Sequence, residues 1–145
     1  MAQTARDIAS ASFSRRLIEA IDDRDVDRVC ALHHPDIEME SAQTPGGLIR
    51  GAAEARAHAE RLLYDNSMLA ISLESVEPLA EDTLLARVAF RRSVSETGHR
   101  LDTCWLLWQL KDGLLWRQYT GSEAELRGKA SLRTIAAGDA SGCDV

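Results

Sequence analysis

Few side chains in this sequence combine the chemistry and the setting that proton transfer requires. Asp102 lies in a predicted strand that runs into an apolar stretch, and a carboxyl group facing an apolar interior would have a raised pKa and could act as an acid or a base. The alternative is an aspartate near a strand end, paired with Arg87 or Arg100. His58 lies at the edge of the apolar face of a predicted helix, where it could be a base or an ordinary residue at the edge of the core.

A third titratable candidate, Glu40, depends on the register of a short predicted strand. Glu38 and Glu40 alternate with Ile37, Met39 and Ser41. If Ile37, Met39 and Ser41 face the interior, both glutamates face water. A slip of one residue would exchange the two faces and would leave Glu40 as a base inside the protein.

Arginines on a neighbouring strand offer a different chemistry. Arg87 and Arg91 share a predicted strand face with Leu85, Ala89 and Ser93. A buried arginine on that face could hold the carboxylate or phenolate of a ligand. The alternative is a face in contact with water or with a second copy of the chain.

The sequence lacks the common cofactor and metal motifs. It contains no GxGxxG, no phosphate-binding loop, no HExxH and no CxxC. Its three cysteines, Cys30, Cys104 and Cys143, cannot all pair, and the first two lie in apolar stretches typical of buried thiols. We therefore expect neither a cofactor nor a metal ion.

The composition predicts one soluble domain. The chain has 145 residues, of which 45% are hydrophobic and 28% charged, and its formal charge is −6, all ordinary for a globular domain. An acidic chain without a basic run is a poor match for nucleic acid. Because it has neither an apolar segment of about 20 residues nor an apolar leader, we expect no membrane partner and a cytoplasmic location.

Hydrophobic periodicity predicts helices first and strands after, which is the α+β class. The predicted helices cover 8–21, 26–34 and 52–63, the second with His33 and His34 in its last turn and ended by Pro35. The predicted strands cover 37–41, 68–79, 83–95, 99–110 and 114–120, with a turn at 44–47 and an Asp-Gly hairpin at 112–113. A brief helix over 123–127 and a flexible tail over 129–145 complete the chain.

One predicted strand is apolar on both of its faces. Between Thr103 and Leu110, one face carries Trp105 and Leu107, and the other carries Leu106 and Trp108. Both faces should therefore be covered. Helices can cover one face, and a second copy of the chain is the simplest cover for the other. We expect a homodimer formed through the sheet.

Five short segments carry a resemblance to a known family. They are DVDRVCAL at 25–32, HPDIE at 34–38, IRGAAEA at 49–55, KDG at 111–113, and Tyr119 followed by Gly121. In order and spacing they resemble the SnoaL-like branch of the nuclear transport factor 2-like superfamily, which includes ketosteroid isomerase and polyketide cyclases. The resemblance covers residues 8–128, so we expect one SnoaL-like domain there, followed by the tail.

The resemblance implies a cone-shaped α+β barrel. Three N-terminal helices would pack on a curved, antiparallel, four-stranded sheet with one additional short strand. The open end of the cone would hold an apolar pocket for a small molecule. Members of the family include cyclases, isomerases, dehydratases, epoxide hydrolases and proteins without any catalytic activity, so the fold does not fix the function.

The catalytic positions of ketosteroid isomerase do not carry the required residues here. That mechanism needs an aspartate base and an oxyanion hole formed by a tyrosine and a protonated acid. By the resemblance, the tyrosine position falls on Leu17, the base on Ser41, and the acid near Trp105 or Leu107. None of these side chains can replace the original group, so we do not expect steroid isomerisation by that route.

The epoxide-hydrolase pattern of the family is also incomplete in this sequence. It needs an Asp-Arg-Asp arrangement, of which Arg100 and Asp102 could supply two members from one strand face. The last strand offers Trp116, Arg117 and Gln118 where a second aspartate would be needed. Asp102 is the best remaining catalytic candidate, because SnoaL-like cyclases use an inward aspartate to move protons; His58 and Glu40 follow it.

These observations predict a protein that binds a small hydrophobic, polyketide- or steroid-like molecule with a carbonyl group. As an enzyme it would be a cofactor-independent cyclase, isomerase or dehydratase that moves protons. The alternative is a non-catalytic ligand-binding or dimerisation module of the same fold, and the sequence leaves this choice open. The expected ligand-binding residues are Leu17, Met39, Ser41, Tyr64, Arg87, Trp105, Leu107, Trp116, Gln118 and Tyr119.

Overall fold

The computed structural model describes residues 5–41, 44–94 and 98–138 and has the mixed α+β architecture expected from the sequence. Its elements, in chain order, are α1 (Ala5–Asp22), α2 (Val26–Ala31), β1 (His33–Ser41), β2 (Thr44–Arg50), α3 (Gly51–Leu63), β3 (Met68–Ala80), β4 (Thr83–Ser93), β5 (His99–Lys111), β6 (Leu114–Gly121) and α4 (Glu123–Gly138). None of the described helices is both long and apolar enough to cross a membrane.

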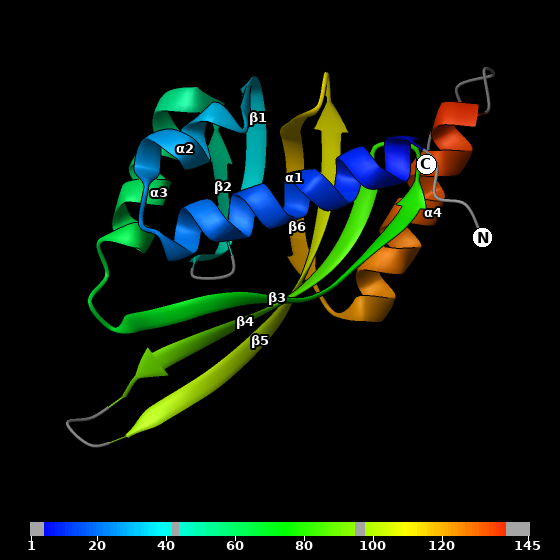
Figure 1. Ribbon diagram of the computed structural model, residues 1–145. Coiled ribbons are helices and arrows are strands. Elements are labelled where there is room, and N and C mark those ends of the chain that lie inside the picture. Colours follow the sequence, from blue (N-terminus) through cyan, green and yellow to red (C-terminus); the bar gives the residue numbers. More distant parts are fainter. Residues whose placement is uncertain (1–4, 42–43, 95–97, 139–145) are drawn as a thin grey trace.

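The strands form one six-stranded sheet in the order β2-β1-β6-β5-β4-β3. All neighbours are antiparallel except β1 and β6, which run parallel. The sheet is strongly curved (Figure 1), yet it ends in β2 on one side and β3 on the other, so it does not close. The expected four-stranded barrel with one short strand is therefore replaced by an open sheet with six strands.

The segment that we expected to be a turn at 44–47 is an edge strand. In β2, Ile49 lies opposite Met39 of β1, and Thr44 lies opposite Ser41. The Pro-Gly-Gly run favours a turn when it is considered alone. An edge strand tolerates proline and glycine, because only one of its sides needs backbone partners, and the pairing with β1 outweighs the local preference.

The second helix ends earlier than expected, so that His33 and His34 belong to β1. The predicted cap is confirmed, because the Asp25 carboxylate accepts a hydrogen bond from the Arg28 amide at 3.1 Å. At the other end, the amide of Leu115 donates to the carbonyl of Leu32 at 2.8 Å. Because His33 already pairs with β6, the backbone is extended from His33 onward, and the helix ends before Pro35.

The larger core lies between the sheet and the first three helices. α1 packs on β3, and α3 packs on β1; Figure 1 shows these helices together on one side of the sheet. The buried side chains at its centre include Phe13, Leu63 and Trp108, with the Phe13 and Trp108 rings edge to face at 5.9 Å. Ile37 and Met39 of β1 face this core, which is the first of the two registers considered for that strand.

The opposite face of the sheet is covered by α4. Leu126 and Ala130 of this helix pack against Leu85 and Leu107, which point away from the larger core. We expected a helix ending at residue 127 and a flexible tail from residue 129, whereas the helix continues to Gly138. Its packing provides cover that we expected from a second copy, so the homodimer stays a prediction. Residues 139–145, with Cys143, lie outside the described residues.

Candidate functional site

An apolar cavity of about 90 Å³ lies between α1, α3 and the inner face of the sheet. The helices contribute mainly aliphatic side chains, and the strands contribute the aromatic rings of Phe90 and Trp108. Its lining consists of Leu17, Ile18, Ile21, Val29, His33, Met39, Ala55, His58, Ala59, Leu62, Leu63, Ile71, Val88, Phe90, Cys104, Leu106, Trp108, Leu115 and Gln118. A cavity of about 150 Å³ holds a benzene molecule, so this one has room for an apolar group of only a few carbon atoms.

Two uncharged histidines interrupt the apolar lining. Burial, and secondly the neighbouring His58, lowers the pKa of His33 to about 4. Burial, and secondly Arg61, also lowers the pKa of His58. Nδ1 of His33 is buried and has no hydrogen-bond partner among the described residues. The cavity therefore offers a neutral imidazole with an unused polar atom, which is costly unless a ligand or water satisfies it.

The amide side chain of Gln118 is held in place by the neighbouring strands. Nε1 of Trp108 donates to Oε1 of Gln118 at 2.9 Å, and Nε2 of Gln118 donates to the carbonyl of Glu40 at 3.0 Å. The carboxylate of Glu40 accepts a hydrogen bond from the Thr120 amide at 2.9 Å. Glu40 therefore ties β1 to β6 and does not line the cavity, while Leu17, Met39, His58 and Gln118 line it as expected.

Several expected pocket residues lie on the other face of the sheet. Trp105 and Leu107 alternate with the cavity residues Cys104, Leu106 and Trp108 along β5, so they point towards α4. Tyr119, opposite Leu107 on β6, packs in the same cluster. Successive side chains of a strand point to opposite faces of the sheet, so the residues next to one that lines the cavity point away from it.

Three other expected contacts, Arg87, Tyr64 and Trp116, are not part of the cavity lining. Arg87 is exposed and its guanidinium lies 5.8 Å from the centre of the Trp105 ring. Tyr64 is 65% exposed at the end of α3. Trp116 lies against Lys111 and Arg117. The side chain of Ser41 lies outside the described residues.

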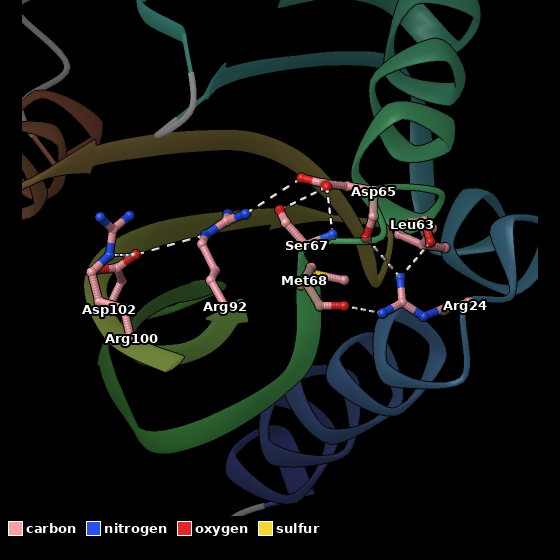
Figure 2. Close-up of polar contacts among 8 residues, drawn as sticks. All are labelled: Arg24, Leu63, Asp65, Ser67, Met68, Arg92, Arg100 and Asp102. Carbon is pink, nitrogen blue, oxygen red and sulfur yellow. Dashed lines mark hydrogen bonds and ion pairs between the residues drawn. The ribbon is translucent and has the colours of Figure 1, made fainter. Parts of the chain in front are cut away.

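Asp102 lines an open polar cleft of about 690 Å³, which lies at the C-terminal end of β4 and the N-terminal end of β5. Its carboxylate is 2.9 Å from Nε of Arg100 and 3.7 Å from Nε of Arg92. The pairing with Arg100 was the alternative to a catalytic role, and it is the arrangement that the structure shows (Figure 2).

A second aspartate joins this cleft from a distant part of the sequence. Asp65, in the turn after α3, lies 3.5 Å from Nη1 of Arg92, so that Arg92 has an aspartate on each side. This aspartate comes from the turn after α3 and lies beside Arg92, whereas the epoxide-hydrolase pattern was sought with Arg100 and an aspartate from the last strand. Hydrogen bonds from Ser67 lower the pKa of Asp65, so this group stays ionised and cannot donate a proton at neutral pH.

The cleft and the cavity adjoin each other. Phe90 and Cys104 line both spaces. Burial raises the pKa of the Cys104 thiol to about 11, so this boundary carries no charge at neutral pH. Among the described side chains, no group of three His, Cys, Asp or Glu residues comes together in a way that could hold a metal ion.

Comparison with known proteins identifies the family. The sequence profile of the SnoaL-like domain matches residues 14–118. No curated protein sequence gives a significant match.

Solved structures support the fold. A protein of Jannaschia sp. CCS1 assigned as a SnoaL-like polyketide cyclase is similar with a TM-score of 0.68 and 12% identity, covering 94% of this chain and 96% of that chain. A Mycobacterium tuberculosis protein in complex with estradiol-17β-hemisuccinate gives 0.64 and 12%, covering 81% and 96%. An epoxide hydrolase of the LEH-like type from the same organism gives 0.61 and 16%, covering 90% and 95%. At these identities the comparisons establish the fold alone.

Proposed function

Because this chain belongs to the SnoaL-like domain family, we propose that it binds a small hydrophobic molecule with a carbonyl group in the cavity between α1, α3 and the sheet. The observation that carries this proposal is an apolar cavity lined by two neutral histidines, one with a buried, unpartnered Nδ1. A ligand carbonyl or an enol hydroxyl is a suitable partner for such an atom. The similar Mycobacterium tuberculosis protein with a bound steroid ester supports a ligand of this general kind.

The size of the cavity favours a smaller molecule than a steroid. Its volume of about 90 Å³ lies well below the range of about 300–1,000 Å³ typical of pockets for drug-sized ligands. The proposed ligand therefore places a body of about four carbon atoms in the cavity. A larger ligand would have to extend into the adjoining cleft.

We propose that the reaction, where one occurs, is proton transfer next to the carbonyl group. A neutral imidazole can accept a proton from carbon, and a second neutral imidazole can donate a hydrogen bond to the carbonyl oxygen. His58 is the proposed base and His33 the proposed hydrogen-bond donor, because both line the same cavity and both stay uncharged at neutral pH. This assignment replaces Asp102 and Glu40, which lie outside the cavity.

A binding experiment tests the first part of the proposal. Amide chemical shifts of the protein are followed by NMR during titration with cyclopentanone. Ala59→Leu fills the cavity from α3 and should abolish the shift changes. Ala57→Leu adds the same atoms on the exposed side of that helix and should preserve them. Equal binding by both variants would refute binding in this cavity.

An exchange experiment separates enzyme from binding module. In D₂O, an enzyme of this type accelerates the exchange of the protons next to the carbonyl of cyclopentanone, and His58→Gln should remove the acceleration. His99→Gln, at an exposed histidine of β5, is the matched control. Binding without exchange would favour the non-catalytic alternative, and the absence of both would refute the proposed function.

A further inference from the structure

The polar cleft beside the cavity contains a cation whose hydrogen-bonding capacity is poorly used. Arg92 is largely buried, with 17% of its side chain exposed, and its guanidinium lies 5.4 Å from the centre of the Phe90 ring. Its two contacts with carboxylates measure 3.5 and 3.7 Å. A charge-assisted hydrogen bond of this type is about 2.7–2.9 Å long. The positions of the two aspartates therefore leave the donors of Arg92 weakly engaged.

The two aspartates have closer partners than Arg92. Asp102 lies 2.9 Å from Nε of Arg100. Asp65 accepts hydrogen bonds from the hydroxyl and the amide of Ser67 at 2.7 and 2.9 Å. Figure 2 shows Arg92 between these two pairs. Because each carboxylate is already held at short distance by another group, Arg92 is the member of the cluster best able to accept a new anionic partner.

The charges along this cluster also favour one additional anion. Asp65 lies between Arg92 and Arg24, whose Nη1 donates to the backbone carbonyl of Asp65 at 3.5 Å. Asp102 lies between Arg92 and Arg100. Three guanidinium groups thus surround two carboxylates, and a bound monoanion would balance the charge.

We propose that the ligand of this protein is an amphipathic monocarboxylate, whose carboxylate binds Arg92 in the cleft and whose apolar chain passes Phe90 and Cys104 into the cavity. This inference rests on the proposed function, to which it adds the chemical class of the ligand. Arg92 offers a planar, two-pronged donor set that matches a carboxylate. Phe90 and Cys104, which line both spaces, form an uncharged boundary suited to the ligand chain.

A pair of probes of equal length tests this inference. Hexanoate and hexanamide differ in charge and share the same apolar chain. By NMR titration at low salt, the parent protein should bind hexanoate at least about tenfold more tightly, the usual contribution of hydrogen bonds to a charged group. Arg92→Gln should remove this preference without weakening hexanamide. Arg91→Gln, on the exposed face of the same strand, should retain it.

The outcomes distinguish the inference from the proposed function. If the parent protein binds the two probes with equal affinity, and Ala59→Leu abolishes the binding of both, the inference is overturned and cavity binding stands. Hexanoate binding that is insensitive to Ala59→Leu would also overturn the inference, since the chain would then lie elsewhere. If neither probe binds while cyclopentanone does, the inference is overturned and the proposed function stands. Should Arg92→Gln not fold, the parent comparison decides, with Arg92→Lys expected to keep part of the preference.

Discussion

Acid should destabilise this fold through His33, because the native state keeps its imidazole neutral. Burial lowers the pKa of His33 to about 4, whereas a histidine in an unfolded chain titrates near 6.5. Below about pH 6.5 the unfolded chain therefore takes up a proton that the native state does not. Stability falls as the pH falls from about 6.5, and the loss from this group is complete below about pH 4.

The size of the effect follows from the two pKa values. The gap between them corresponds to a total of ~3 kcal/mol in the free energy of unfolding, of which about 2 kcal/mol is lost by pH 5. His58 acts in the same direction, because burial and Arg61 lower its pKa as well. A loss of about 2 kcal/mol is a substantial fraction of the stability of a typical domain, which is about 5–15 kcal/mol.

Urea unfolding of the parent protein and His33→Leu at pH 7 and pH 5 measures this contribution. Leucine removes the titrating group and keeps an apolar side chain at the cavity wall. The parent protein should lose about 2 kcal/mol more than His33→Leu between the two pH values. Carboxylates common to both proteins cancel in this comparison. His99→Gln should retain the parent's loss, and an equal loss in His33→Leu and the parent would refute the argument.

Three further predictions concern the framework of the fold. Leu126→Ala should lower the free energy of unfolding in urea by about 3 kcal/mol, because this buried side chain joins α4 to the sheet. Leu126→Met should lower it by less than about 1.5 kcal/mol, and equal losses in the two variants would show that α4 does not pack there. Arg24→Ala should lower the free energy of unfolding by about 2 kcal/mol in the same assay. Arg24 donates hydrogen bonds to the carbonyls of Leu63 and Met68 and so joins the α1–α2 turn to the end of α3 and the start of β3. An unchanged urea concentration at the unfolding midpoint would contradict this. Sedimentation equilibrium should detect a dimer at micromolar concentration, and a monomer alone would exclude the predicted homodimer.

The sequence patterns that depend on local order predicted the elements well. The Asp-Gly hairpin is confirmed, with Asp112 and Gly113 both at positive φ, as this turn type requires. The two strand faces of 103–110 and the need to cover both are also confirmed, although α4 contributes to the cover. The extent of helix α4 was underestimated, because the packing of Leu126 and Ala130 against Leu85 and Leu107 joins segments that are distant in the sequence.

The errors in the site arose from strand parity and from contacts between distant segments. Trp105 and Leu107 were placed in the pocket through a family position, but alternation with Leu106 sends them to the other face. His33 was missed because it was assigned to the end of a helix. The repeat of Ile37 and Met39 does not reveal it either, because the pairing of β1 with β6 shifts register between His33 and Glu38. The approach of Asp65 to Arg92 joins segments 27 residues apart, and no local pattern encodes it.

The distribution of charge indicates what the site selects. Groups that line the cavity are apolar or held neutral, as the low pKa of His33 and the raised pKa of Cys104 show. Arg92 and its two aspartates lie in the adjoining open cleft, which shares Phe90 with the cavity, and the aspartates are partly exposed to water there. Moving a charge into the cavity would forfeit that solvation without providing a partner. We therefore expect a ligand to bury its uncharged part in the cavity and to keep any charge outside it, with Arg92 as the proposed partner.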